Sequence, residues 1–290
     1  MRAIRARAVL QPRTVDKAAT VLLWSIAVGI LGLLGAILLY LLWNGLPYLS
    51  WQFIISPPKE MEAGGGVGPE VFNSLYILTL SMVFALPVGI GAGIYLSEYA
   101  KPNKRTEAVR LSVEALASVP SIVLGLFGMI IFVNLAGWGF SILGGAATLA
   151  LLNLPVLVRV TEETLRSVPR SYREASLALG ANKWQTIARA VLPSALPGLM
   201  SGVILAAGRA LGETAILIFT AGTSVSRQPF DPNPFAAGET LAVRLWYVRS
   251  EALVPDAAQI ASASAALLII MVLVVTLSVR LPAWWLNKRR

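Results

Sequence analysis

The sequence predicts an all-α polytopic membrane protein with six transmembrane helices. Of its 290 residues, 56% are hydrophobic and only 13% are charged, and the mean hydropathy is +0.71. A soluble domain carries about a quarter of its residues as charge, so an ordinary globular enzyme is excluded. Two further observations support the same fold class: the apolar residues fall into six separate stretches, and the basic residues concentrate in alternate loops.

Each apolar stretch meets or approaches the length of about 20 residues that a helix needs to cross the hydrocarbon core. The six are Thr20–Trp43, about Val71–Leu96, about Val113–Leu135, about Ile142–Val158, Pro197–Phe219 and Ala261–Val279. Basic residues precede the first stretch, as in a signal peptide. That stretch is nevertheless longer than the roughly 7–15 apolar residues of a cleaved signal, so we expect a retained helix.

The loops give the predicted organisation and orientation. We expect a basic tail over 1–19, the first helix over 20–43, an external loop over 44–69, a transmembrane domain over 70–280 with a long loop at 159–196, and a second basic tail over 281–290. Nineteen Lys and Arg residues fall in 1–19, 97–112, 159–196 and 280–290, and four fall on the opposite side. Because basic loops stay cytoplasmic, both termini are predicted to be cytoplasmic.

The same composition narrows the function classes. Histidine and cysteine are absent, which removes the imidazole and thiolate chemistry of many active sites and any His or Cys metal site. An intramembrane aspartyl protease needs aspartates within the membrane, and the three present here lie outside the predicted spans (Asp16, Asp231 and Asp256). No phosphate-binding G-x-x-x-x-G-K-[ST] loop occurs. Because the net charge of +9 flanks apolar spans, we expect contact with lipid headgroups and no binding to nucleic acid.

The 159–196 loop predicts two short helices. Pro169 suits a first helical turn, Gly180 suits a left-handed helix end, and Asn182 can cap a second helix that Pro193 and Pro197 end. A hairpin of this kind can lie on the bilayer, read DNA as a helix-turn-helix, or dock a cytoplasmic protein through its small residues. Two flanking spans tether it to the membrane, which disfavours DNA.

A motif in this loop resembles a known family. The run Glu174-Ala175-Ser176-Leu177-Ala178-Leu179-Gly180, followed by Leu192-Pro193, resembles the EAA loop of bacterial ABC importer permeases. Ser176 replaces the second Ala of the pattern, and Ala190 stands where Ile is usual. The resemblance implies a type I ABC importer permease fold with cytoplasmic EAA coupling helices that insert into a cleft on an ATPase. The docking residues it implies are Glu174, Ala175, Ser176 and Gly180.

The fifth predicted span carries two charges, Arg209 and Glu213. An Arg at the centre of a membrane helix costs about 2.5–3.5 kcal/mol on insertion scales, so the pair needs a reason. Their i, i+4 spacing places both on one face of a continuous helix, where they can pair with each other. Alternatively, this face lines a polar path, with the guanidinium of Arg209 offering several donors to an oxyanion.

The surrounding motifs indicate the substrate class. Gly208-Arg209-Ala210-Leu211-Gly212-Glu213-Thr214 closely resembles a segment of the permeases of phosphate-specific ABC importers, and GIYLSEYA (93–100) and SVPSIVLGLFG (118–128) do so too. The form of the first two segments is more similar to the PstA than to the PstC type. The resemblance implies a substrate path at Arg209, Glu213 and Thr214. Glu213 either accepts a hydrogen bond from the P–OH of hydrogen phosphate or only holds Arg209 in position.

The same resemblance implies a set of partners in a bacterial inner membrane. They are a second, PstC-like permease, PstB-like ATPase subunits that bind the ATP and Mg, a PstS-like extracytoplasmic phosphate-binding protein, and inorganic phosphate itself. This chain is then a non-catalytic subunit without a cofactor of its own. The remaining alternatives are a permease for another oxyanion, such as molybdate or sulfate, and the PstC-like role.

Overall fold

The computed structural model describes residues 12–59, 62–224, 229–251 and 254–288, and every regular element in these ranges is a helix. Arg2, Arg5, Arg7, Arg227, Arg289 and Arg290, which enter the predicted charge pattern, lie outside these ranges. The α-helices are α1 (Pro12–Gly45), α2 (Trp51–Ile55), α3 (Gly68–Ile94), α4 (Lys104–Ser118), α5 (Ser121–Gly128), α6 (Ile142–Ser167), α7 (Arg170–Ala178), α8 (Lys183–Thr186), α9 (Leu192–Gly212), α10 (Ala215–Thr220), α11 (Leu241–Ser250) and α12 (Ala257–Lys288). A 3-10 turn, η1 (Leu46–Tyr48), and three π turns, η2 (Tyr95–Tyr99), η3 (Met129–Leu135) and η4 (Ile187–Val191), join some of them.

Five helical segments in the described part of the chain are long and apolar enough to span a membrane. They are Asp16–Tyr48, Gly68–Tyr99, Ile142–Ser167, Lys183–Gly212 and Ala257–Leu281. A sixth span is reached if the bent pair Lys104–Ser118 and Ser121–Leu135 is taken as one. The predicted first, second and sixth spans therefore lie within single long segments, whereas the other three differ in form. The predicted tail over 281–290 also differs, because α12 continues to Lys288.

The predicted third span, 113–135, is sharply bent in the structure. The chain turns by 99° between α4 and the segment that begins with α5. Pro120 lies at this bend, and Val119 before it has an extended backbone (φ −68°, ψ 127°). A residue that precedes proline is disfavoured in the α conformation by contact with the proline ring, which explains why the helix stops here.

The predicted fourth span, 142–158, is too short, because α6 continues through Pro155 to Ser167. The 159–196 loop therefore begins as transmembrane helix. Helices α3 and α9 pack closely against α6 through glycines, with Gly89 against Leu157 and Gly202 against Val160. Small residues of this kind allow close approach of helix backbones in membrane proteins. This packing surrounds α6, and neighbouring helices make a proline in the helix interior tolerable.

The predicted fifth span, 197–219, is interrupted. The π turn η4 leads directly into α9, so Pro193 and Pro197 do not end the helix that precedes them. Helix α9 instead ends at Gly212, and the short α10 follows it and packs against α5 and α6. The two glycines at the end of α9, Gly208 and Gly212, have low helix propensity, which is consistent with a break at this point.

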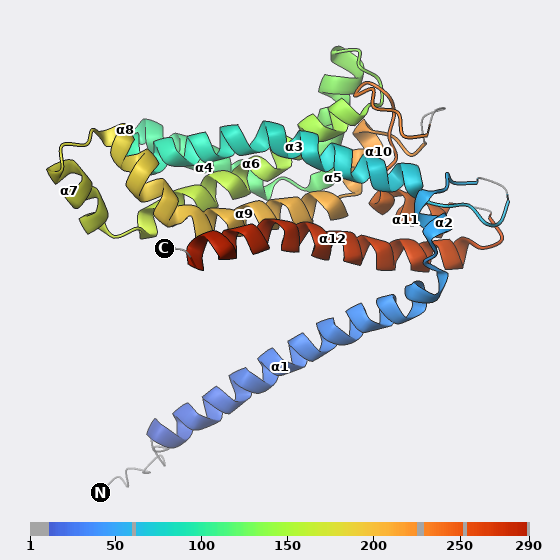
Figure 1. Cartoon of the computed structure of the whole chain (residues 1–290), viewed down its shortest axis with the longest axis horizontal. Helices are drawn as coiled ribbons and strands as arrows, with labels where there is room; N and C mark the ends of the chain where they lie inside the picture. Colours follow the sequence, from blue (N-terminus) through green and yellow to red (C-terminus); the bar gives the residue numbers. More distant parts are fainter. Residues whose placement is uncertain (1–11, 60–61, 225–228, 252–253, 289–290) are drawn as a thin grey trace, which may run out of the picture.

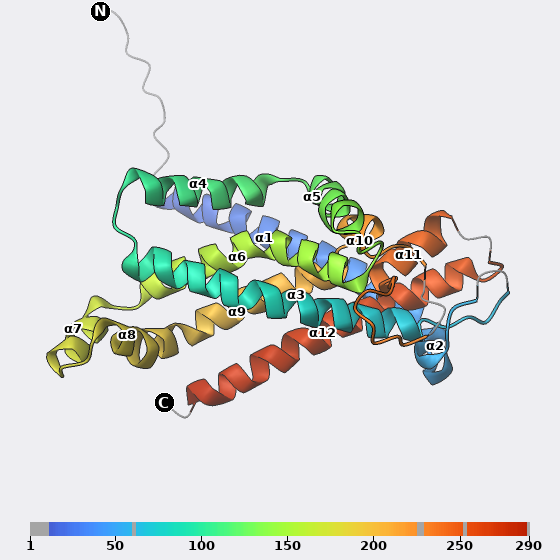
Figure 2. The same ribbon diagram turned by 90° about the horizontal axis from the view of Figure 1, so that it is seen from above.

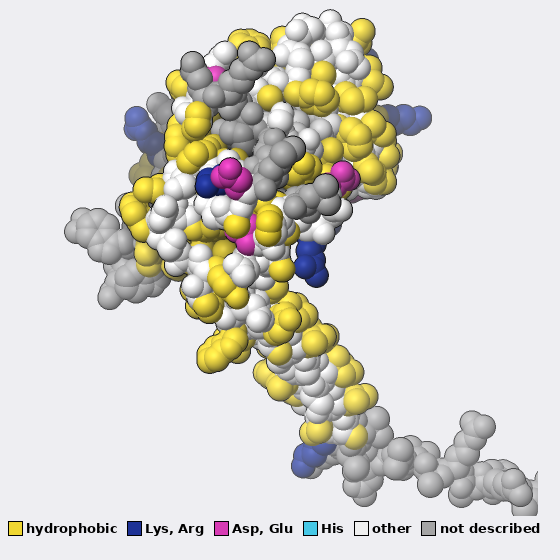
Figure 3. Space-filling view, turned by 90° about the vertical axis from the view of Figure 1, so that its right-hand side faces the viewer, with side chains coloured by type: hydrophobic (Ala, Val, Ile, Leu, Met, Phe, Trp, Pro, Cys, Tyr) yellow, Lys and Arg dark blue, Asp and Glu magenta, His cyan; other side chains and the backbone are white. Residues whose placement is uncertain are grey.

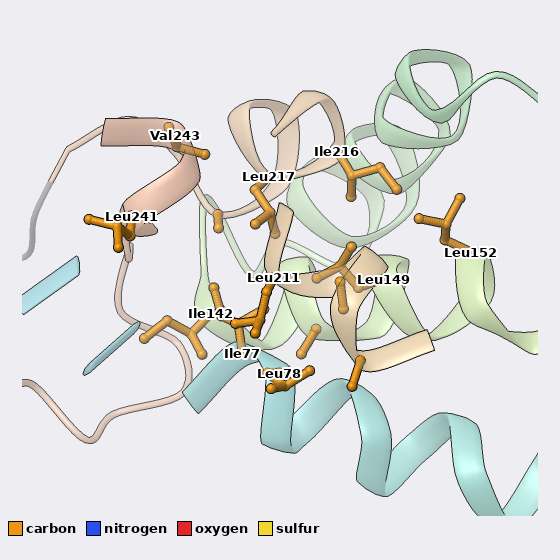
Figure 4. Close-up of a cluster of buried hydrophobic side chains, with 14 of the residues drawn as sticks. Ile77, Leu78, Ile142, Leu149, Leu152, Leu211, Ile216, Leu217, Leu241 and Val243 are labelled. Carbon is orange, nitrogen blue, oxygen red and sulfur yellow. The ribbon is translucent and has the colours of Figure 1, made fainter. Parts of the chain in front are cut away.

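The largest core cluster joins the parts of these helices that lie toward α10 and α11. It is built from apolar side chains of several elements that meet around α10 (Figure 4), including Leu78 of α3, Leu149 of α6, Leu211 of α9 and Leu217 of α10. Because α10 contributes fully buried residues to this cluster, the interrupted span is fixed in place by packing at its break.

Helix α1 leaves the bundle. Figure 1 shows it splayed from α12, which it approaches near its C-terminal end. At that contact Gly45 is buried against Ser262 and Ala266, so that a Cβ at this position would collide with both. The rest of α1 exposes hydrophobic side chains from Val21 to Trp43, visible along the projecting helix in Figure 3. An apolar surface of this length suits lipid or another membrane helix.

A buried charged cluster fastens α11 to α3. Arg244 of α11 is 4% exposed and lies 3.9 Å from the Glu70 carboxylate of α3 and 3.8 Å from the Glu239 carboxylate. The side-chain amide of Asn73 donates to the Glu239 carbonyl (3.1 Å), and the Leu241 N–H donates to Ser74 Oγ (2.9 Å). The segment that precedes α12 is thus anchored to the bundle by buried polar contacts.

Candidate functional site

The first predicted site lies at the end of α9. Arg209 belongs to the last turn of the helix, whereas Glu213 follows its last residue and has an extended backbone (φ −74°, ψ 125°). Thr214 is the cap residue before α10. The Arg209 side chain is exposed, and those of Glu213 and Thr214 are half-buried.

The ion pair between Arg209 and Glu213 that their i, i+4 spacing allowed does not form in the structure. An i, i+4 pair requires a continuous helix, and α9 ends between the two residues. None of the ion pairs formed within the described part of the chain includes Arg209 or Glu213. The guanidinium of Arg209 is therefore free to bind a group from outside this chain.

Packing between α6 and α9 gives the depth of Arg209. The two helices run antiparallel, with Gly198 against Thr164 and Gly202 against Val160. Extended by seven residues, this register brings Arg209 level with Asn153. At 1.5 Å per residue, that level is about 16 Å from the start of α6 and about 21 Å from its end. Arg209 therefore lies near mid-height of a helix long enough to cross the membrane.

The backbone beside Arg209 is open. A Cβ added at Gly208 or at Gly212 would meet no atom within 4 Å, in contrast to Gly198 and Gly202 on the same helix. These two glycines therefore fill no packing role within this chain. Glycine where space is free is expected where a ligand or another backbone approaches closely. Reasoning from the sequence did not find this open backbone, although the two glycines on either side of Arg209, Gly208 and Gly212, could have indicated it.

The second predicted site is the hairpin of α7 and α8. Gly180 has the positive φ (+82°) expected at the left-handed end of a helix. Asn182 caps α8 through a capping box with Gln185, in which Asn182 Oδ1 accepts from the Gln185 N–H at 2.8 Å. The predicted pair of short helices joined by a tight turn is confirmed. Figures 1 and 2 show that this hairpin protrudes beyond the ends of the long helices.

The four predicted docking residues do not share one environment. Glu174, Ala175 and Gly180 are exposed. Ser176 instead faces α8, where its Oγ lies 3.0 Å from Thr186 Oγ1 in a hydrogen bond. This contact explains the serine at a position where the motif has alanine, because its hydroxyl closes the hairpin.

The hairpin also exposes large apolar side chains that the sequence reasoning did not assign to docking. They are Tyr172, Leu177, Leu179 and Trp184, with Leu179 89% exposed. Apolar side chains grouped on a protruding element mark an interaction site. The sequence could have indicated this surface, because these large apolar residues lie on a hairpin that is too short and too polar to enter the core.

A family model described as "binding-protein-dependent transport system inner membrane component" matches residues 85–290. The chain belongs to this family. It is thus a multi-pass membrane permease of an ABC importer, and membership implies an ATPase and a substrate-binding protein as partners. The predicted all-α permease fold is confirmed.

Two relatives and one solved structure illustrate the likeness of this permease to known proteins. It is 45% identical over 275 residues to the probable ABC transporter permease protein YqgI of Bacillus subtilis (strain 168). This match covers 91% of this chain and 94% of YqgI. It is 41% identical over 180 residues to the phosphate transport system permease protein PstA of Xylella fastidiosa (strain 9a5c), covering 61% of this chain and 62% of that protein. The inward-facing MetNI methionine ABC transporter has a chain of the same fold, with a TM-score of 0.61 at 20% identity, covering 75% of this permease and 94% of that chain.

The start of α1, the α7–α8 hairpin and the end of α12 lie toward one end of the permease, opposite α2 and α11 (Figures 1 and 2). The predicted topology requires this arrangement, because it assigns all three segments to one side of the membrane. That this side is the cytoplasm rests on the charge distribution and stays a prediction.

Proposed function

We propose that this permease is the PstA-type subunit of an ATP-driven inorganic phosphate importer. It forms half of the translocation path together with a PstC-like permease, receives phosphate from a PstS-like binding protein and docks a PstB-like ATPase that binds ATP and Mg. Both termini and the α7–α8 hairpin are cytoplasmic in this assignment.

The observation that carries the proposal is the free guanidinium of Arg209 near the middle of the membrane. A charge at this depth is costly, and neither Glu213 nor another described side chain pairs with it. A divalent oxyanion satisfies the fork of N–H donors. The PstA relatives support phosphate as that anion. Gly208 and Gly212 leave room for it at the backbone.

Glu213 and Thr214 complete the proposed path. Because Glu213 does not hold Arg209 in the structure, a positioning role through a direct ion pair is disfavoured in this conformation. Its half-buried carboxylate is available to accept a hydrogen bond from the P–OH of hydrogen phosphate, which sulfate lacks. The Thr214 hydroxyl adds a donor beside it.

The α7–α8 hairpin is the proposed ATPase dock. Glu174 and Ala175 are exposed on α7, and Leu177, Leu179 and Trp184 supply apolar contact area. A narrow helix bearing small and apolar side chains fits a cleft on a partner. The apolar side chains, rather than Ser176, are expected to contribute most of the binding energy.

Uptake of labelled phosphate tests the substrate. The permease is reconstituted in vesicles with its partner permease, ATPase and binding protein, and ATP-dependent uptake is measured with arsenate, sulfate and molybdate as competitors. We expect competition by arsenate alone, and loss of uptake by at least tenfold in Arg209→Ala. Arg280→Ala, an exposed arginine on α12, is the matched control. Inhibition by molybdate or sulfate at equal concentration would show that the permease serves another oxyanion.

A further inference from the structure

The inner end of α3 carries a buried carboxylate that the proposed path does not use. Glu98 lies in the π turn η2, and its side chain is only 9% exposed. Burial of an unpaired carboxylate is costly, so its partner is informative. That partner is Arg173 of α7, which lies 75 residues further along the chain.

The Arg173 guanidinium joins three elements. Its Nε donates to both Glu98 carboxylate oxygens (3.3 Å each), and its Nη2 donates to Glu98 Oε1 (2.5 Å). Its remaining donors reach the end of α6, with Nη2 to the Leu165 carbonyl (2.8 Å) and Nη1 to the Val168 carbonyl (2.9 Å). The Val168 carbonyl lies just beyond the last residue of α6, and the Leu165 carbonyl also accepts from the Val168 N–H that caps the helix (3.3 Å). One side chain thus connects α7 both to η2 and to α6.

Helix α7 has few other attachments to the membrane helices. None of its residues is fully buried. Its main packing contacts are with α8 and η4, which form the other arm of the hairpin. Ser176 also contacts this arm through Thr186. The cleft of about 540 Å³ beneath α7 is lined by Glu98, Arg173 and neighbouring charged side chains. Besides Arg173, the hairpin reaches η2 through Lys183 of α8, whose Nζ lies 4.6 Å from the centre of the Tyr99 ring.

The turn η2 is linked in the same way to α4. Arg110 of α4 donates from Nη2 to the Leu96 carbonyl (3.3 Å) and from Nε to Glu162 of α6 (3.0 Å). Arg166 holds the same carboxylate from the α6 side (2.6 Å). A displacement of η2 therefore acts on α4, the helix that leads into the 99° bend before α5.

We propose that Glu98 and Arg173 form the joint that transmits movement of α7 to α3 and, through Arg110, to α4. The inference rests on the proposed docking of the ATPase at α7. Glu98 is thus a positioning residue that acts through Arg173 and touches neither phosphate nor ATP. Bidentate pairing of a guanidinium with a carboxylate resists rotation better than a single contact, which suits transmission of a displacement.

Transport and ATP hydrolysis separate this role from a structural one. In the reconstituted full transporter, we expect Glu98→Ala to retain ATPase binding and basal hydrolysis. Phosphate uptake and the stimulation of hydrolysis by the loaded binding protein should each fall by about tenfold or more. In Glu98→Gln, whose side-chain oxygen still accepts from the guanidinium, uptake and stimulated hydrolysis should lie between the values for the unaltered permease and for Glu98→Ala. Glu62→Ala is the matched control, because its ion pair with Lys59 (3.2 Å) is exposed and links residues of one loop.

A distance measurement tests the joint independently of the transported anion. The chain has no cysteine, so paired spin labels are introduced at Ser112 of α4 and Ser278 of α12, both exposed. Addition of MgATP and vanadate should change their separation in the otherwise unaltered permease, and not in Glu98→Ala with the ATPase bound. An unchanged response in Glu98→Ala would overturn the joint. So would a loss of uptake and hydrolysis in strict proportion to the amount of assembled complex, which indicates a structural brace.

Failure of the underlying function gives a different pattern. If Leu179→Asp leaves ATPase binding intact, the docking assignment is wrong whatever Glu98 does. If the unaltered transporter takes up another oxyanion, the substrate is wrong, and the distance change still reports on the joint.

Discussion

Arg209 and Glu213 are separated by the end of α9, and no ion pair joins their side chains. Arg209 lies in the last helical turn, while Glu213 begins an extended connection to α10. The two charges are thus presented as independent groups beside an open stretch of backbone. This arrangement makes their functional and structural contributions separable by experiment.

A double-mutant cycle on uptake and stability measures that independence. We expect Glu213→Gln to alter the free energy of unfolding by less than about 0.5 kcal/mol, since a partly exposed side chain without a partner contributes little. Uptake should fall in Arg209→Ala and in Glu213→Gln. A coupling free energy for stability above about 1 kcal/mol would mean that the two side chains pair. Phosphate uptake at the unaltered rate in Glu213→Gln would exclude a role for its charge.

Gly180 should be required for the shape of the docking hairpin. Alanine at φ +82° places a Cβ against the following carbonyl, at a cost of about 1–2 kcal/mol. We expect Gly180→Ala to speed amide hydrogen exchange across 170–190 and to weaken ATPase binding several-fold. Gly91→Ala is the control, because Gly91 lies in helical backbone with open space at its Cβ position. Equal exchange in the two variants would argue against a strained turn.

Arg244 should dominate the stability of the region where α11 packs against α3. Removal of one member of a buried charged cluster leaves the others uncompensated and costs about 3–5 kcal/mol. We expect Arg244→Met to lower the thermal unfolding midpoint in detergent by several degrees, together with loss of order in α11. The control is Arg249→Met, an exposed arginine on the same helix. If both variants unfold at the same temperature, the Glu70–Arg244–Glu239 cluster does not stabilise the fold.

The contact of Gly202 with Val160 should be sensitive to volume. A Cβ at position 202 would lie 2.7 Å from Val160 Cγ1, and overpacking of this kind costs about 1–3 kcal/mol. We expect Gly202→Ala to lower the unfolding midpoint, and Val160→Ala in the same chain to restore most of the loss. Because Arg209 lies further along the same helix, uptake should fall in Gly202→Ala and should recover in the double variant with Val160→Ala. Absence of rescue would indicate that α6 and α9 are not in this register.

Much of the fold follows from local properties of the sequence. The length of each apolar run predicts α1, α3 and α12, because a membrane helix satisfies its backbone hydrogen bonds internally and needs little from its neighbours. The α7–α8 hairpin is predicted by residues whose backbone preferences are local, namely Gly180 and Asn182. The family was likewise indicated by contiguous motifs.

The tertiary structure decided the rest, because each remaining feature depends on what lies beside a residue. Pro155 leaves α6 intact where neighbouring helices enclose it, whereas Pro120 marks a 99° bend. The interruption at Glu213 is fixed by the packing of α10 against α5, and it separates two charges that a continuous helix would have paired. Arg173 pairs with Glu98, which lies 75 residues earlier in the chain. A sequence records the spacing of residues along the chain, while these contacts depend on the separation of helices in space.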